Sequence, residues 1–360
     1  MKKQMICLAA GASLLLMAMT ACGDSSKPES AAVLSDPASE PETSAAVVTA
    51  SDNDSDFNNA LAEMDAVAAA MAANDGETFV ELLGIRNIVD LQMDVQELGS
   101  GKTVTQADRN NAFDQLTASL PVESGTEPAD YVLGEPTERR DLSLLSAEVM
   151  SDISDNLRGR ADADGKRLLE CMRDLFWFDG AYTVPVTLKS PSAEEHTVCL
   201  YLLHDSSGWH PDGARVPMMY GYARKMRLAA ANDAAKTLRY ALISAITDLN
   251  AEDRELSLLD GTYSVSGEDF ASAQAPDSHE TTDEMLAYLL YEAPFYYKDA
   301  VKAGTVVFRI KDGDVTALAL EFGEIPDMDT AGNVPVYGTA PEPLSSDAYK
   351  SADSLSDLIQ

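Results

Sequence analysis

Apolar side chains recur at helical spacing from residue 57 onward. Six of them lie along one stripe with a period near 3.6 residues: Phe57, Leu61, Met64, Val67, Ala68 and Met71. This period predicts an amphipathic helix. Asp56 is suited to cap its start, and Asn74-Asp75-Gly76 to break it before a second helical piece at residues 79–83.

Three further helices are predicted before residue 180. Thr105 is suited to cap a helix that ends before Pro121, and residues 147–157 and 166–178 also have helical spacing. The intervening segment IVDLQMDVQELG, residues 88–99, is acidic and its pattern is ambiguous.

After Gly180 the apolar period changes to two. Apolar and polar residues alternate in YTVPVTLK, residues 182–189, and a second strand, HTVCLYLL, covers residues 196–203 before the turn HDSSGWH. This alternation predicts an antiparallel meander. Pro185 has no N–H for the ladder, so its strand is expected at a sheet edge or bulged.

A long helix is predicted at residues 224–253. One stripe along it consists of Met226, Ala230, Ala234, Leu238, Leu242, Ala245 and Leu249. A short strand, GTYSVSG, follows, and then a helix capped by Thr281 or Thr282. The last pattern is a hairpin over residues 305–322, in which Asp312-Gly313 is suited to a tight turn with positive φ.

These patterns predict an α+β fold with helices packed on antiparallel sheets, in two small domains at residues 57–215 and 216–322. Residues 24–56 contain no aromatic residue, eight acids and three prolines, which predicts a disordered acidic linker. Residues 323–360 are similarly acidic and Pro-rich, and we expect an irregular tail whose end, DAYKSADSLSDLIQ, can form a short docked helix.

The first 21 residues have the layout of a secretory signal peptide. Lys2 and Lys3 precede an uncharged stretch at residues 6–19, and small residues precede Cys22. As a helix, this stretch of 14 residues would span roughly 21 Å, which is short of the ~30 Å hydrocarbon core of a bilayer. A permanent membrane-spanning helix is therefore not expected.

The residues Met19-Thr20-Ala21-Cys22-Gly23 resemble the lipobox of bacterial lipoproteins. The resemblance implies cleavage before Cys22, diacylation of Cys22 with palmitate-like chains, the thiol being the lipid carrier, and anchoring on the extracytoplasmic face of the cell membrane. Two acyl chains suffice for stable anchoring. The alternative is an ordinary signal peptide with a chance cysteine.

Two further cysteines, Cys171 and Cys199, remain in the mature chain. In an exported protein they can form a disulfide, and two free buried thiols are the equal alternative.

The charge balance restricts the partners. The chain has 26 Lys+Arg and 60 Asp+Glu, a net charge of −34. Nucleic-acid binding needs clustered Lys and Arg, so it is not expected. The same charge repels anionic lipid, so the membrane contact would come from the acyl chains on Cys22. The negative charge also favours cationic partners or divalent ions.

Residues 57–213, with a helix followed by paired strands that end in SSGWH, resemble the NTF2-like and cystatin-like domains of bacterial lipoproteins. That resemblance implies a sheet curled around a helix with an apolar pocket. Trp177, Tyr201 and Trp209 are the candidate pocket residues. No catalytic residue of the enzymatic members has a counterpart here. The long helix with its strands also resembles the soluble part of a pilin-like subunit, which implies shape alone.

Several motifs point weakly to chemistry. Gly99-Ser100-Gly101-Lys102-Thr103 resembles the end of a phosphate-binding loop, but Gln96 stands where that loop needs its first glycine. Two calcium-loop patterns, one from Asp52 to Glu63 and one at residues 162–165, lack the required glycine or ligands, and weak Ca²⁺ binding stays compatible with them.

The turn from His204 to His210 brings histidine, aspartate and serine together, but proximity in sequence makes no triad. We interpret these as solvent-exposed turn residues, and we expect no catalytic residue, cofactor or metal. The aromatic residues between Tyr288 and Tyr297 are expected to pack in a core.

The function expected from the sequence is a non-enzymatic, lipid-anchored extracytoplasmic protein that binds a peptide, a polymer or another envelope protein. One alternative is a hydrolase or isomerase that uses an NTF2-like pocket. Another is a pilin-like structural subunit.

Overall fold

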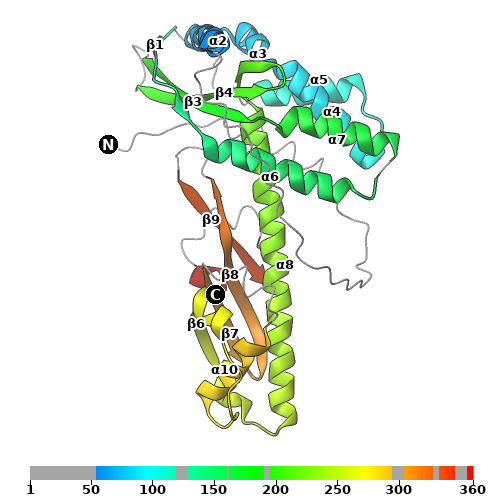
Figure 1. Ribbon diagram of the computed structural model, residues 1–360, viewed down its shortest axis with the longest axis vertical. Coiled ribbons are helices and arrows are strands. Elements are labelled where there is room, and N and C mark those ends of the chain that lie inside the picture. The colour runs from blue at the N-terminus through cyan, green and yellow to red at the C-terminus, as the bar shows by residue number, and fades with distance from the viewer. Residues whose placement is uncertain are drawn as a thin grey trace. The chain divides into compact units, whose positions relative to one another are not determined.

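The protein is seen in a computed structural model that describes residues 54–118, 128–160, 162–189, 195–293, 304–326, 332–344 and 355–359 (Figure 1). The signal peptide, Cys22 and the acidic linker before residue 54 lie outside these ranges. The chain divides into two compact units, Met1–Tyr222 and Ala223–Gln360. The boundary therefore lies seven residues after the predicted one.

Unit 1 combines helices with one antiparallel sheet, as the α+β prediction requires. Its helices are α2 (Asp54–Ala72), α3 (Gly76–Leu82), α4 (Ile85–Ser100), α5 (Gln106–Thr117), α6 (Arg140–Leu157), α7 (Ala163–Phe176) and the first residues of α8 (Arg215–Ala251). Its strands are β1 (Asp130–Leu133), β2 (Thr137–Glu138), β3 (Gly180–Lys189), β4 (His196–Asp205) and β5 (Gly208–Asp212).

Short polar side chains start three helices of unit 1, and the sequence predicted one of these caps, Thr105. Thr105 forms a capping box with Asp108 at α5, and Asp75 caps α3 through the backbone N–H of Thr78. Asp162 caps α7 by accepting from the N–H of Gly165 at 2.7 Å. The second calcium-like pattern, residues 162–165, is therefore the start of a helix with its cap. The ambiguous acidic segment is part of α4, which is bounded by Gly84 and Gly101 in left-handed conformation.

The sheet of unit 1 has the order β1-β3-β4-β5, with β2 also paired to β3. The predicted meander is confirmed, but the strand that contains Pro185 is interior rather than at an edge. Pro185 lies between the segments of β3 paired with β1 and with β2, and its carbonyl accepts from the N–H of Gly134 on that side. In an antiparallel strand, the N and C=O of one residue face the same side. The missing donor therefore faces the gap between β1 and β2.

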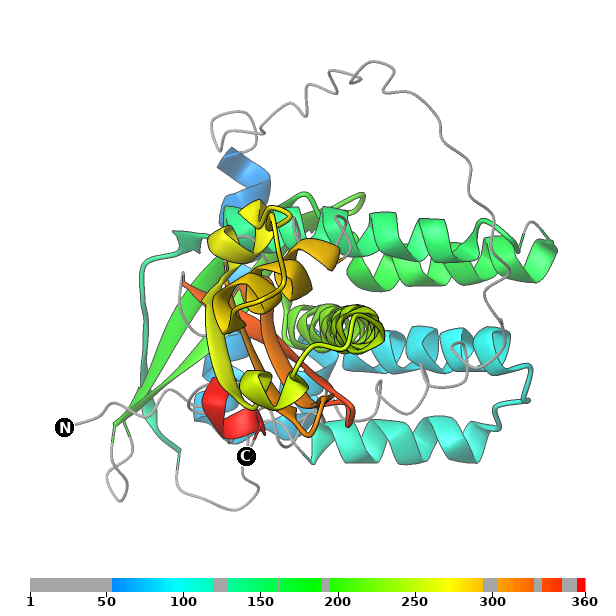
Figure 2. The same ribbon diagram turned by 90° about the horizontal axis from the view of Figure 1, so that it is seen from below.

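Helices cover this sheet and pack on one another. α2 packs across β1, β4 and β5, while α6 and α7 lie side by side and α4 packs against α7 (Figures 1 and 2). Val184, Val186, Leu200 and Leu202 are fully buried on the sheet. The sheet and the helices that cover it thus share one buried apolar core in unit 1.

Unit 2 contains the rest of α8 and a second antiparallel sheet, here called sheet B, with the order β6-β7-β8-β9. Its elements are η3 (Leu256–Leu259), β6 (Gly261–Ser266), α9 (Gly267–Ser272), α10 (Thr282–Glu292), β7 (Thr305–Lys311), β8 (Asp314–Pro326), β9 (Asn333–Ala340) and η4 (Leu355–Ile359). Thr281 caps α10 in a capping box, and Asp312 and Gly313 have the predicted positive φ.

The predicted apolar stripe of α8 forms the main core of unit 2. Leu238, Leu242 and Leu249 pack with Val306, Phe308 and Leu320 of sheet B, whereas Ala230 is exposed. Part of the segment predicted to be an irregular tail is regular, because β8 extends to Pro326 and β9 continues the sheet. Its predicted docked helix is present as η4.

Candidate functional site

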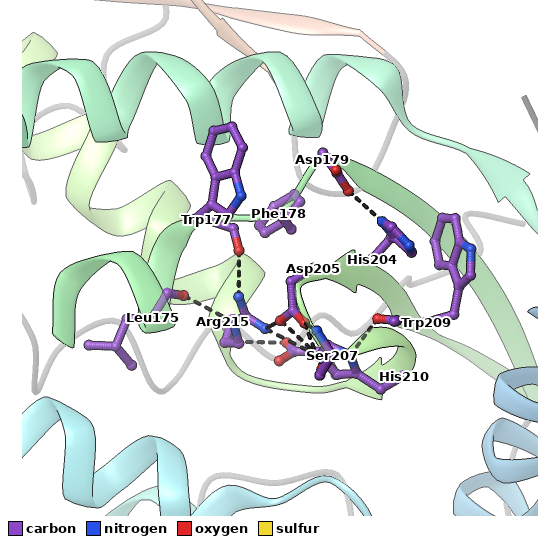
Figure 3. Close-up of polar contacts among 12 residues, drawn as sticks. Leu175, Trp177, Phe178, Asp179, His204, Asp205, Ser207, Trp209, His210 and Arg215 are labelled. Atoms are coloured by element: carbon purple, nitrogen blue, oxygen red, sulfur yellow. Dashed lines mark hydrogen bonds and ion pairs between the residues drawn. The ribbon is translucent and has the colours of Figure 1, made fainter. Parts of the chain in front are cut away.

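A polar network surrounds Arg215, at the start of α8 (Figure 3). The Arg215 side chain is only 7% exposed. Its Nε donates to the carbonyl of Leu175 at 3.1 Å, and Nη2 donates to the carbonyl of Trp177 at 2.7 Å. Its Nη1 donates to Oδ2 of Asp205 at 2.7 Å. One guanidinium therefore joins the end of α7, strand β4 and the first residue of α8.

Asp205 is the anionic partner of this network. Its Oδ1 accepts from the N–H of Ser207 at 2.9 Å and from the Ser207 hydroxyl at 2.6 Å. Desolvation acts to raise the pKa of Asp205, but the donors on Ser207 and Arg215 outweigh it and hold the pKa below its usual range. His210 lies beside the pair, with Nε2 at 3.2 Å from Nη1 of Arg215.

A second carboxylate, Asp212, is fully buried beneath the network. Its Oδ1 accepts from the N–H groups of Ala214 and Arg215 at 3.0 and 2.8 Å. These bonds satisfy donors at the start of α8. Burial raises the pKa of Asp212, and the charge of Arg215 opposes that rise.

These contacts correct the interpretation of His204, Asp205 and His210 as solvent-exposed turn residues, whereas Ser206 and Ser207 are exposed as expected. The side chains of His204 and Asp205 are 17% and 16% exposed. The serine hydroxyl donates to Asp205, and Nδ1 of His210 lies 3.2 Å from the carbonyl of Gly208. A nucleophile–base pair would need serine and histidine bonded to each other. These bonds instead fix the conformation of the turn. In the sequence, the one indication of this network was Asp212, which lies three residues before Arg215 and caps the start of α8.

An aromatic cluster, defined here as Phe57, Tyr182 and Trp209, lies at one end of the sheet. The three ring centroids are 5.0 to 5.4 Å apart, in tilted and edge-on arrangements, and each residue is partly exposed. The His204 ring is 5.1 Å from the Trp209 ring, and Nδ1 of His204 lies 2.5 Å from Oδ1 of Asp179. Of the aromatic cluster, only Trp209 was a candidate from the sequence; Phe57 and Tyr182 were predicted only as helix and strand residues, and Asp179 was not singled out.

Asp56 fixes the cluster to the start of α2. Its Oδ2 accepts from the backbone N–H of Trp209 at 3.0 Å. α2 begins at Asp54, so Asp56 lies inside the helix instead of capping it as predicted. Gly180 leaves room for the indole, because a Cβ there would lie 2.7 Å from Cη2 of Trp209.

The structure does not bring the three candidate pocket residues together. Trp209 belongs to the aromatic cluster, and Trp177 contributes its carbonyl to Arg215 while its ring points away from Trp209 (Figure 3). Tyr201 is 1% exposed. It pairs with Asp212, whereas Trp209 pairs with His204, so Tyr201 and Trp209 lie on opposite faces of the sheet.

A cavity of about 670 Å³ in unit 1 lies where α4 ends and α7 begins. Its lining combines acids, arginines and the glycine-rich loop: Asp94, Glu97, Leu98, Gly99, Ser100, Gly101, Thr103, Arg160, Asp164 and Arg167. The loop follows the C-terminus of a helix, where the dipole disfavours phosphate. A phosphate-binding role is therefore disfavoured, as its sequence suggested.

Cys171 and Cys199 do not form a disulfide with each other. Cys171 is buried in α7, and burial raises the pKa of its thiol; Cys199 lies partly exposed on β4. Throughout the described ranges, no three His, Cys, Asp or Glu side chains gather as a metal ion would require. Asp52 of the first calcium-like pattern lies outside these ranges.

Comparisons with family models, curated proteins and solved structures find no match. The fold therefore defines the class: an α+β protein of two units, with a packed aromatic surface in unit 1. Among the helices that the structure describes, none has the length and apolarity needed to cross a bilayer.

Proposed function

We propose that this chain is a lipid-anchored extracytoplasmic binding protein, attached through acyl chains on Cys22. The lipobox-like residues 19–23 and the short apolar stretch before them support the anchor. The net charge of −34 supports attachment by lipid rather than by the protein surface.

The aromatic cluster is the proposed binding surface, and it is the observation that carries the proposal. Tyr and Trp contribute large contact areas at low entropic cost and are enriched in binding hot spots. Here the rings contact one another and are fixed from below by Asp56, so binding would order few side chains. The ligand class is a peptide, a polymer or another envelope protein.

Polar groups around the cluster suit a ligand with hydrogen-bond donors or positive charge. Asp179 is 49% exposed beside His204, and the ion pair of Glu138 with Arg140 lies near Tyr182. Apolar rings with acceptors at the rim match the general composition of binding interfaces.

We propose a non-catalytic role because the polar groups beside the cluster are bonded to one another. Arg215, Asp205 and Ser207 each use their bonding capacity within the network. A catalytic site would need a base within reach of a nucleophile or substrate.

The anchor is tested by the intact mass of protein extracted from membranes. We expect a chain that begins at Cys22 and carries acyl chains, and a Cys22→Ser variant that is lost from the membrane fraction. An unmodified, freely secreted product would refute the anchor and leave the aromatic surface to be tested separately.

The surface is tested with purified chain and isolated envelope fractions, namely murein sacculi and detergent-extracted envelope proteins. We expect Trp209→Ala to weaken retention at least 10-fold, because a central hot-spot ring is lost. Tyr240→Ala is the matched control, since Tyr240 is a 57% exposed aromatic residue on α8. Equal retention of both variants and the unmodified chain would refute the surface.

A further inference from the structure

The cavity of about 670 Å³ in unit 1 lies between two helix ends. Its lining comes from two stretches of chain, residues 94–103 and 160–167, so the end of α4 meets the start of α7 where the two helices pack together (Figure 1). The glycine-rich loop at residues 99–103, to which the proposed function gives no role, contributes to this lining. The charges along these two stretches determine which ligand the cavity suits.

The α7 wall of the cavity offers hydrogen-bond donors with positive charge. Nη2 of Arg160 donates to the carbonyl of Leu98 at 3.3 Å, and Nη2 of Arg167 lies 3.8 Å from Oδ2 of Asp94. A guanidinium has five N–H donors, so both arginines keep donors for a ligand. Gly165 lets the backbone of Arg160 approach α7, because a Cβ on that glycine would clash with the Arg160 carbonyl. Arg160 is thereby held at the cavity.

The α4 wall offers acceptors with negative charge. Glu97 is 40% exposed, and its Oε2 lies 3.9 Å from Nη2 of Arg109. The same Arg109 binds Asp94 more closely, at 2.6 Å, so most of the free acceptor charge on this wall belongs to Glu97. The carbonyls of Gly99 and Ser100 accept no hydrogen bond from the part of the chain that the structure describes. They lie at the C-terminal end of a helix, which carries partial negative charge.

The charges of the lining balance one another. Once Asp94 is counted with Arg109, the lining holds two carboxylates, Glu97 and Asp164, and two guanidinium groups. The chain as a whole carries a net charge of −34, so this neutrality is local. A simple anion would face the carboxylates without compensation, and a simple cation would face the guanidinium groups. A ligand with one charge of each sign finds a partner for both.

We propose that this cavity binds a short peptide with free termini. Arg160 and Arg167 hold its carboxylate, for which the planar guanidinium is suited. Glu97 and the carbonyls of Gly99 and Ser100 hold its ammonium group. Small-ligand cavities measure roughly 300–1,000 Å³, so this cavity of about 670 Å³ has room for a peptide of a few residues. No residue of this site belongs to the aromatic cluster, so the inference does not rest on the proposed function.

The test measures peptide binding by isothermal titration calorimetry, on the full-length chain with Cys22→Ser so that it carries no lipid. Trialanine carries both terminal charges, its N-acetylated form lacks the ammonium group, and its C-terminal amide lacks the carboxylate. We expect saturable binding of trialanine. Either blocked peptide should bind roughly 10-fold more weakly, because it lacks one charged hydrogen-bonding group.

Two single variants assign the peptide termini to the two walls. Arg167→Gln should weaken trialanine binding roughly 10-fold and leave the affinity for the amide unchanged, because the amide has no carboxylate to lose. Glu97→Gln should likewise leave the affinity for N-acetyl-trialanine unchanged. Arg167 and Glu97 are 66% and 40% exposed, so neither substitution threatens the fold. Arg158→Gln is the matched control, because Arg158 is 79% exposed and lies outside the lining.

Three results would overturn the inference. The first is no saturable binding of trialanine up to about 10 mM. The second is an effect of Arg167→Gln that is equal for trialanine and its amide, or no larger than that of Arg158→Gln. The third is loss of trialanine binding in Trp209→Ala, which would place the peptide on the aromatic cluster and support the proposed function instead. Retained binding in that variant separates the two sites, whatever the outcome for the aromatic cluster.

Discussion

Arg215 shows how one buried charge can organise a surface. Its three acceptors come from two segments, the end of α7 and the end of β4, and none of them lies on the helix that carries Arg215. A lysine cannot replace it, because an ammonium lacks the planar fork that reaches several acceptors. Trp209 of the aromatic cluster lies on the β4–β5 hairpin that this arginine holds through Asp205.

Removing this charge should destabilise unit 1 strongly. We expect Arg215→Ala to lower the free energy of unfolding by about 3–5 kcal/mol, because two carbonyls and Asp205 lose their partner. Urea unfolding measures the change. Arg158→Ala is the control, since Arg158 is 79% exposed and should change stability by less than about 0.5 kcal/mol. Equal effects of both variants would contradict the network.

The low pKa of Asp205 predicts a defined pH dependence. A carboxyl whose pKa is lower in the folded chain contributes stability above its unfolded pKa and loses it as pH falls through the folded value. We therefore expect the stability difference between the unmodified chain and Asp205→Asn to be constant near neutrality and to narrow below about pH 4. Urea midpoints at several pH values test this, and a difference that widens in acid would refute it.

Gly180 should control the position of Trp209. An alanine there places its Cβ against the indole and against Cβ of His204, at 2.7 and 3.0 Å. We expect Gly180→Ala to cost about 1–3 kcal/mol and to shift the indole emission, measured in a Trp177→Phe background so that one tryptophan remains. Gly159→Ala is the control, because a Cβ at Gly159 meets open space. An unchanged emission spectrum would show that the cluster is loosely packed.

At the scale of elements, close approach of backbones fixes α8 against β9. A Cβ on Gly338 would lie 2.1 Å from the carbonyl oxygen of Ala231. The Asn232 amide also bonds to the N–H groups of Thr339 and Leu344 and to the carbonyl of Leu344. The helix therefore meets this strand through small residues and one amide.

Enlarging that glycine should separate the two elements. We expect Gly338→Ala to destabilise unit 2 by at least about 2 kcal/mol, because backbone rather than a flexible side chain must move. Hydrogen exchange of β9 amides measures the loss of protection. The matched control is Gly261→Ala on β6, where the nearest atom would be at an ordinary 3.6 Å. Similar protection in both variants would contradict the close approach.

The elements differ in how far sequence could predict them. Alternation fixed β3 and β4, and capping residues fixed the starts of α5 and α10. α4 was ambiguous because its acids obscure the helical period, although Ile85, Ile88 and Val89 are buried. The interior position of Pro185 was not predictable, since it depends on a gap between β1 and β2, two short strands that no pattern indicated.

At the scale of the whole molecule, charge dominates. The net charge of −34 makes the folded chain repel itself, and salt screens that repulsion. We expect the thermal midpoint to rise as NaCl increases from 20 to 500 mM, measured by circular dichroism on the Cys22→Ser chain. A midpoint that falls with salt would mean that local ion pairs, such as that of Arg109 with Asp94, outweigh the global repulsion.

Local patterns predicted the fold class but not the candidate site. The site joins Phe57 to Trp209 and Asp179 to His204, and no periodicity reports pairs so far apart. Trp177 and Tyr201 were candidates because of their residue type. Strand alternation places Tyr201 on the face of the sheet opposite Trp209, and Trp177 lies at the end of α7. Residue type could suggest a binding surface, while its membership required the fold.

The small contact between the segment Leu355–Ile359 and sheet B has a consequence for the behaviour of the purified protein. A protease that cuts between Leu344 and Leu355 would leave the segment Leu355–Ile359 held only by its apolar contacts with Val307 and Ala319 of sheet B. Once that fragment dissociates, Val307 and Ala319 are exposed, and an exposed apolar surface favours aggregation. Proteolysis during storage would then cause aggregation before any loss of secondary structure.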